Sequence, residues 1–243
     1  MLRIANQGSW KPLSPTTVAG EEQFEGMKAY VYGQFSQAGN FNARFQQTGK
    51  EQGVVTWNGG PPVLEFKYGI SFISAEQARA SLEKELPGWN FEQVKARAKA
   101  AWDRNLGMIE TEGGSQAQRR TFYTALYRCF ERMVDITEDS SYYSNYDKQV
   151  HRADRPFYTD DWIWDTYLAL HPLRCILQPD VETDMIASYI RMYEQGGWLP
   201  TFPVVWGDNP CMNGFHTTIT ILDAWRKGIR NFDAEKAYSG MRK

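Results

Sequence analysis

The sequence lacks the features that mark membrane, nucleic-acid-binding and nucleotide-binding proteins. It has no run of about 18 apolar residues, so it predicts no membrane-spanning helix. Lys and Arg number 27 against 29 Asp and Glu, a net charge of -2, whereas proteins that bind nucleic acid non-specifically carry an excess of cations. Neither GxGxxG nor GxxxxGKS/T occurs, so a nucleotide phosphate loop is not expected.

Cysteine is also scarce. Cys129, Cys175 and Cys211 lie far apart and form no CxxC pair. They allow at most one bridge and predict neither a zinc site nor a disulfide framework. The first residues, MLRIANQGSWKPLSPTT, contain no apolar stretch of about 7–15 residues, so they predict no secretory signal.

Aromatic residues, in contrast, are abundant. The 9 Trp, 13 Tyr and 13 Phe make up 14% of the chain, and apolar residues make up 42%, which is typical of a globular protein with a core. Flat apolar faces with polar edges suit sugar rings. A core that is rich in aromatic residues is the alternative interpretation.

The first part of the chain has the pattern of strands. Large apolar residues alternate with small or polar ones over 30–35, 53–57 and 63–73, and Asn58-Gly-Gly-Pro-Pro62 separates the last two. Period-two runs between turn residues predict antiparallel strands. The segment is too short to close a sandwich or barrel alone.

From Ser74 onward the pattern becomes helical. Ser74 and Gln77 form a predicted capping box for a helix over 75–86, and Pro87-Gly88 ends it. Further helices are predicted over the following ranges: 91–106, 122–133, 160–171, 181–194, 215–227 and from 233 onward. Strands followed by helices alone predict a helical bundle, a repeat array or an α/α toroid, and no fixed repeat period supports the array.

Acidic and aromatic residues concentrate in 158–167. They are Asp160, Asp161, Trp162, Trp164 and Asp165. On a continuous helix, Asp161 and Asp165 would share one face, where a cation or sugar hydroxyls would be needed to offset their repulsion. Asp160 or Asp161 capping a helix is the alternative. Asp165 lies deeper and is the stronger functional candidate.

A second candidate segment, 196–216, is rich in Gly, Pro and Trp and precedes a predicted helix. Shaped loops on rigid scaffolds often carry function. If Trp206 desolvates Asp208, the pKa of that carboxyl would rise and it could act as a general acid. Asp208 could instead cap the next helix or form an Asx-turn with Asn209. His216 could bond a hydroxyl or cap the helix.

Several motifs occur together in a characteristic order. They are FYTALY (122–127), WDTY (164–167), LHPL (170–173), QPD (178–180), YEQGGWLP (193–200), CMNG (211–214) and FDAEKAY (232–238). Their order and spacing resemble the glycoside hydrolase family 92 α-mannosidases over roughly residues 65–243. These are exo-acting enzymes that degrade N-glycans and yeast mannan.

The resemblance implies an α+β chain, mostly α, with the C-terminal part of a β-sandwich followed by part of an (α/α)6 toroid. The implied domains are a partial sandwich at 1–73, linker helices at 74–107 and the N-terminal part of the catalytic toroid at 108–243. It further implies a Ca2+-assisted inverting mechanism in which one carboxylic acid protonates the leaving oxygen and another carboxylate activates water. The ligands of the calcium are not identified.

The resemblance also assigns roles. The family's general acid is usually a Glu four residues before the Met of the MetXaaGly element, and counting back from Met212 gives Asp208. Asp165 is then expected to bind or orient substrate, with Trp164, Trp206 and His216 in the pocket wall. An Asp is one methylene shorter than Glu, and a misplacement of about 1 Å can cost about a hundredfold in rate.

The resemblance implies that the family's general base and most of its calcium ligands come after Lys243. About seven helices are predicted where a toroid has twelve, so the sequence is expected to be an internal segment of a longer enzyme, inactive alone. Family members act in the periplasm or are secreted, and a mannose-containing oligosaccharide is the expected substrate. The alternatives are a non-catalytic carbohydrate-binding relative that has lost the Glu acid, and another toroid glycosidase with a different sugar preference.

Overall fold

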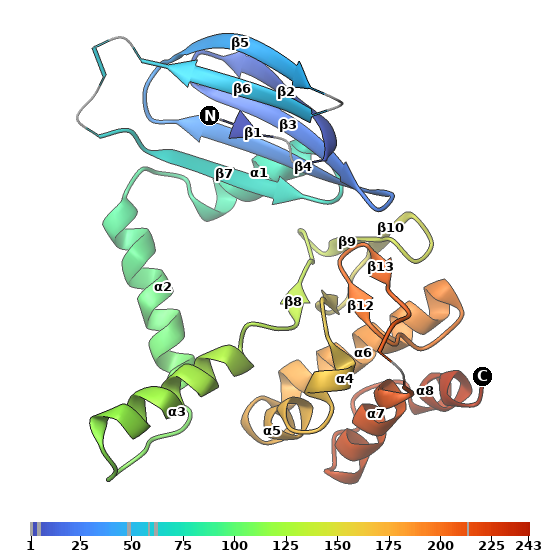
Figure 1. Ribbon diagram of the computed structural model, residues 1–243. Helices are drawn as coiled ribbons and strands as arrows, with labels where there is room; N and C mark the ends of the chain where they lie inside the picture. Colours follow the sequence, from blue (N-terminus) through green and yellow to red (C-terminus); the bar gives the residue numbers. More distant parts are fainter. Residues whose placement is uncertain (1, 4–5, 48–49, 58, 61–62, 213) are drawn as a thin grey trace. The chain divides into compact units, whose positions relative to one another are not determined.

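The computed structural model describes residues 2–3, 6–47, 50–57, 59–60, 63–212 and 214–243. The chain forms two compact units, Met1–Val94 and Lys95–Lys243. Strands and helices are both well represented (Figure 1), which confirms the α+β class. The predicted domain boundaries, sandwich and toroid remain predictions.

Among its described residues, the first unit contains two antiparallel sheets (Figure 1). One sheet has the order β2 (Gln7–Ser14), β3 (Thr17–Phe24), β4 (Met27–Phe35) and β7 (Phe66–Ser71). The other has the order β1 (Leu2–Arg3), β6 (Lys50–Thr56) and β5 (Asn40–Gln47). The predicted strands at 30–35, 53–57 and 63–73 are therefore confirmed in outline. The predicted turn at 58–62 lies largely outside the described residues.

A helix covers one face of the larger sheet. α1 (Ala75–Glu85) begins after Ser74, whose hydroxyl accepts the Gln77 N–H at 3.0 Å, as the capping pattern predicts. α1 packs on β4 and β7 and buries Ala78 and Leu82 against Tyr32. Gly69 permits this approach, because a Cβ there would lie 2.2 Å from the Ala78 carbonyl oxygen.

Two helices follow α1. α2 (Phe91–Leu106) and α3 (Gln116–Cys129) pack through Trp102 and Tyr127, whose ring centroids are 4.4 Å apart. A complete capping box at Ser115 and Gln118 starts α3 and was not part of the sequence prediction. α3 ends before Met133, so the predicted extension of this helix to 133 is wrong: Val134 already belongs to a strand.

Three short strand pairs interrupt the helices of the second unit. They are β8 (Val134–Asp135) with β11 (Tyr158–Thr159), β9 (Ser141–Ser144) with β10 (Gln149–Arg152), and β12 (Pro203–Val204) with β13 (Gly207–Asp208). The prediction that helices alone follow Ser74 is therefore wrong. Strands of two to four residues are too short to show a period-two pattern, and tertiary pairing decides them.

The remaining helices are α4 (Ile163–Thr166), α5 (Leu170–Leu177), α6 (Pro179–Gly196), α7 (His216–Arg226) and α8 (Ala234–Met241). The predicted continuous helix over 160–171 is wrong, because Asp160 has a φ of 63° and the chain starts a new helix at Leu170. α6, α7 and α8 enclose a core that includes Ile186, Ile221 and Ala237. Among the described helices, none is both long and apolar enough to cross a membrane.

Candidate functional site

The segment before α4 is fixed to the loop that carries Asp208. The Asp161 N–H donates to the Pro203 carbonyl at 2.8 Å, and the Thr159 hydroxyl donates to the Val204 carbonyl at 3.1 Å. Pro203 and Val204 form β12, which pairs with β13. The two segments that the sequence singles out, 158–167 and 196–216, are therefore held side by side by one backbone hydrogen bond and one from a side-chain hydroxyl.

Neither Asp160 nor Asp161 caps α4, so that alternative is wrong. Trp162 is the N-cap residue of α4 and makes no side-chain cap bond. The Asp160 carboxylate instead accepts from the Arg132 guanidinium at 2.8 Å, and this guanidinium also lies over the Trp162 ring at 3.9 Å from its centroid. Asp161 precedes the helix and is fully buried, so the prediction that it shares a helix face with Asp165 is also wrong.

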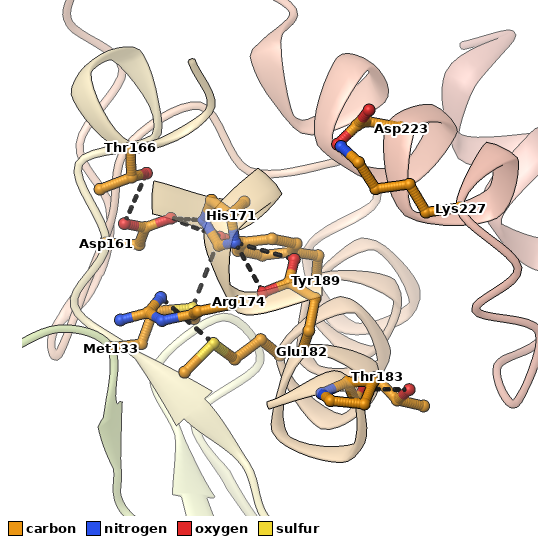
Figure 2. Close-up of polar contacts among 12 residues, drawn as sticks. Met133, Asp161, Thr166, His171, Arg174, Glu182, Thr183, Tyr189, Asp223 and Lys227 are labelled. Atoms are coloured by element: carbon orange, nitrogen blue, oxygen red, sulfur yellow. Dashed lines mark hydrogen bonds and ion pairs between the residues drawn. The ribbon is translucent and has the colours of Figure 1, made fainter. Parts of the chain in front are cut away.

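Asp161 belongs to a buried polar network that Figure 2 shows. Its carboxylate accepts from the Thr166 hydroxyl at 2.9 Å and from the Tyr189 hydroxyl, and it lies 3.0 Å from His171 Nε2. On the other side of the imidazole, Nδ1 lies 2.9 Å from Glu182 Oε1. The side chains of His171, Asp161 and Glu182 are at most 1% exposed. The network joins α4, α5 and α6.

The two carboxylates keep the buried imidazole charged. Burial by itself lowers the pKa of His171, but Glu182 and Asp161, through charge and hydrogen bonds, raise it to about 9. Burial raises the pKa of Asp161, yet the hydrogen bonds and charge of His171, with help from Tyr189 and Thr166, lower it overall. Burial also raises the pKa of Tyr189 well above its usual value, so its hydroxyl stays a donor. At neutral pH this is a carboxylate–imidazolium–carboxylate chain.

Trp164 and His216, both predicted to line the pocket, come together in the structure. Their ring centroids are 5.4 Å apart, and the Tyr167 ring lies 4.1 Å from the His216 ring. Gly214 leaves room for this arrangement, because its φ is 138° and a Cβ there would lie 2.0 Å from His216 Cε1. Trp164 remains 46% exposed, so part of its surface is open to a ligand.

Asp165 follows Trp164 on α4. Its side chain is exposed, whereas its helical neighbours Ile163 and Thr166 are buried. An exposed carboxylate beside an exposed indole can accept hydrogen bonds from sugar hydroxyls. The role of Asp165 in binding or orienting substrate stays a prediction.

Asp208 lies in β13, and its carboxylate accepts hydrogen bonds from the loop around it. Its Oδ1 accepts the Phe202 N–H at 2.7 Å and the Thr201 N–H at 3.1 Å. Its Oδ2 accepts the Thr201 hydroxyl at 3.0 Å. Asp208 is exposed, and the neighbouring Trp206 is 38% exposed. The carboxylate thus organises residues 201–208, and its assignment as general acid stays a prediction.

The loop has a second support in the β9–β10 hairpin. Asn145 donates through Nδ2 to the Trp206 carbonyl and accepts from Lys148 Nζ at 2.6 Å through Oδ1. The neighbouring Tyr146 hydroxyl is buried and has no hydrogen-bond partner among the described residues. Burial, with a smaller effect of the Asp208 charge, raises the pKa of Tyr146 well above its usual value. Tyr146 is therefore a neutral phenol near the predicted acid.

The structure gives no basis for placing a metal here. Within the described part of the chain, no three His, Cys, Asp or Glu side chains gather in a way that could hold an ion. The exposed carboxylates of Asp165 and Asp208 could each supply one oxygen, which falls short of the six to eight that calcium takes. We therefore derive no step through calcium from these residues.

Sequence reasoning missed the buried network. A signal for it was present: Glu182 stands one and two helical turns before Ile186 and Tyr189, on the apolar stripe of α6. A carboxylate in that position requires a buried partner. The partner is His171 of the LHPL motif, which contributed to the resemblance but received no role.

Comparisons with known proteins agree with these motifs. Residues 77–243 match the model of the glycosyl hydrolase family 92 catalytic domain. The chain is 30% identical to a family GH92 inverting mannosidase of Bacteroides thetaiotaomicron, with a TM-score of 0.87 over 98% of this chain and 35% of that one. A second mannosidase of that bacterium, solved in complex with mannoimidazole, has the same fold, with a TM-score of 0.84 at 24% identity over 97% of this chain and 34% of that one.

A curated relative is an uncharacterized secreted glycosidase of Arthroderma benhamiae, 27% identical over 206 residues. The match covers 83% of this chain and 22% of the relative. The chain thus spans about a third or less of the length of these proteins. The family match extends over more than half of the sequence and includes all the residues of the candidate site. The chain belongs to glycosyl hydrolase family 92.

Proposed function

We propose that the whole protein is an exo-acting α-mannosidase that removes terminal α-linked mannose from N-glycans or mannan with inversion of configuration. The observation that carries the proposal is the 30% identity and the TM-score of 0.87 to an inverting mannosidase over 98% of the chain. The mannoimidazole complex of a second neighbour supports a mannose-containing substrate. A location in the periplasm or outside the cell rests on the resemblance and on a relative that is named as secreted.

In this proposal the described residues form one wall of the sugar site. Asp208 is the general acid, and Asp165 binds or orients the substrate. Trp164 and His216, in ring contact at 5.4 Å, and Trp206 line the pocket. Exposed indoles can stack on the apolar face of a hexose while the carboxylate accepts from its hydroxyls.

An inverting glycosidase needs a second carboxylate. It stands roughly 6.5–9.5 Å from the acid, so that a water molecule fits between it and the anomeric carbon. The resemblance places this base in the family's downstream sequence. The same resemblance is the sole support for a partial sandwich and half a toroid, and for the expectation that this segment alone is inactive.

Calcium dependence is part of the proposal on the resemblance alone. Calcium would supply charge to hold sugar hydroxyls and help the ring toward its transition state. Treatment of the full-length protein with a chelator, followed by addition of calcium, tests this. Activity that a chelator abolishes and calcium restores is expected, and full activity in the chelator would contradict it.

The activity itself is tested with the full-length protein, an aryl α-mannoside and α-1,2-mannobiose. Release of mannose is expected, and NMR at early times should show the β-anomer first, because inversion at an α-linkage forms the β-sugar. Initial release of the α-anomer would contradict inversion. No release from either substrate would count against an α-mannosidase.

A second candidate is a carbohydrate-binding relative that no longer catalyses hydrolysis. The observation that favours it is the use of Asp208 by the loop: three donors from Thr201 and Phe202 occupy its carboxylate. The variant Asp208→Glu in the full-length protein distinguishes the two functions. A large gain in hydrolysis would favour an enzyme that has lost activity through the change from Glu to Asp. Unchanged mannan binding without turnover would favour a binding protein.

A further inference from the structure

Asp161 connects α4, which bears Trp164 and Asp165, to the loop that bears Trp206 and Asp208. Its N–H holds Pro203 at the start of the 203–208 hairpin, and its carboxylate holds Thr166 at the end of α4. Trp162, Trp164 and Asp165 lie between the two attachment points. A shift of Asp161 would therefore move α4 and the Asp208 loop together.

Asp161 is held in turn by charge. His171, 1% exposed, bridges Asp161 on α4's N-terminal side and Glu182 on α6 with contacts of 3.0 and 2.9 Å. Figure 2 shows the imidazole between the two carboxyl groups. The buried imidazolium fixes the positions of both carboxylates, because a carboxylate that moved away would be left buried without its charged partner. The neutral Tyr189 hydroxyl donates a further hydrogen bond to the Asp161 carboxylate.

We propose that Asp161, His171 and Glu182 are positioning residues that set the geometry of the Trp162–Asp165 segment and of the 201–208 loop for sugar binding. This inference rests on the proposed function, and it adds a pH switch to it. While the imidazole is protonated, the chain of charges is complete. When it loses its proton, the imidazole keeps a single N–H for two adjacent buried carboxylates, so the charge that holds Asp161 in place is lost and the segment is held less firmly.

Each element around His171 contributes charged or titratable groups. α6 brings Glu182 and Tyr189, and the segment before α4 brings Asp161. On α5 itself, Arg174 donates to the Cys129 carbonyl at 3.1 Å, and the pKa of Cys175 is raised to about 11 by burial and then by Glu182. On α7, Asp223 and Lys227 form an ion pair with each other. Of these, Glu182, Asp161 and the Tyr189 hydroxyl, which lies 3.2 Å from Nε2, contact the imidazole directly.

The test compares Glu182→Gln with Glu194→Gln in the full-length protein. Both variants remove one carboxylate from α6, but Glu194 pairs with the exposed Lys236 instead of His171. The protein carries 13C-labelled histidine and 5-fluorotryptophan, and the 19F signals are assigned with Trp164→Phe and Trp206→Phe. The imidazole whose signal responds to Glu182→Gln and not to Glu194→Gln is His171.

The expected titration midpoint of His171 is near pH 9, and Glu182→Gln should lower it by roughly one unit or more. The 19F signals of Trp164 and Trp206 should change at the same midpoint and move with it in the variant. The alkaline limb of kcat for the aryl α-mannoside should shift by the same amount. Glu194→Gln should leave all three unchanged.

The proposal would be overturned if the indole signals did not change as His171 titrates. It would also be overturned if Glu182→Gln and Glu194→Gln gave the same titration midpoint and the same pH profile. If Glu182 has a purely structural role, Glu182→Gln will lower the stability without moving the pH profile, and this result would also overturn the proposal. If the unsubstituted protein releases no mannose, the proposed function fails, but the coupling between the imidazole and indole signals still decides whether the network positions the segment.

Discussion

Replacement of Gly214 by Ala isolates the contact that brings His216 to Trp164. The new Cβ would lie 2.0 Å from Cε1 and 2.1 Å from Nδ1 of His216, whereas ordinary contact begins at 3.4 Å. The imidazole must therefore move by about 1.4 Å or the backbone must change. Either response breaks the ring contact with Trp164 at 5.4 Å and with Tyr167 at 4.1 Å.

Two effects contribute to the expected magnitude. A side chain at a φ of 138° costs about 1–3 kcal/mol in backbone strain. If His216 lines the sugar site as proposed, its displacement by about 1 Å can cost about a hundredfold in rate. The control is Gly228→Ala, since Gly228 also has a positive φ, 96°, but a Cβ there meets nothing within 4 Å. This control carries strain without the collision.

The free energy of unfolding in urea and kcat/KM of the full-length protein measure the two effects. We expect both variants to lose about 1–3 kcal/mol of stability. A loss of roughly a hundredfold in kcat/KM is expected for Gly214→Ala only, together with a changed 19F signal of Trp164. Equal kinetics for the two variants, or an unchanged Trp164 signal in Gly214→Ala, would refute the argument.

Three further predictions concern stability. The pKa of His171 is raised from 6.5 to about 9, so its contribution to stability is fully present below pH 6.5 and is lost as the pH rises through about 9. The free energy of unfolding should therefore fall by about 3 kcal/mol over that window. The variant His171→Gln should abolish this decline. In Gly69→Ala, the Cβ would lie 2.2 Å from the Ala78 carbonyl oxygen. Urea unfolding should therefore show that the first unit loses about 1–3 kcal/mol of stability. An unchanged unfolding midpoint would show that α1 does not pack closely on β7. Asp208→Asn keeps one acceptor oxygen for the loop, so a loss of about 1 kcal/mol is expected, with faster amide exchange at Thr201 and Phe202; unchanged exchange would contradict the loop role of Asp208.

The sequence by itself determined many of the longer regular elements and the family. Period-two runs identified strands in the first unit, and the helices at 75–85, 91–106 and 216–226 were predicted within one or two residues. These elements depend on local propensity, capping and long amphipathic patterns, which a single sequence carries. The ordered motifs identified glycoside hydrolase family 92 because several short matches in register are specific even when each is weak.

Tertiary structure decided the details around the site. The break at Asp160, the two-residue strands and the end of α3 before Met133 depend on contacts with distant residues, such as the bond from Asp161 to Pro203. Sequence spacing suggested that Asp161 and Asp165 share a face, yet one is buried against His171 and the other is exposed. Burial and charge pairing arise only when α4, α5 and α6 meet, so the folded chain alone determines which aspartate is buried in an ion pair and which is exposed.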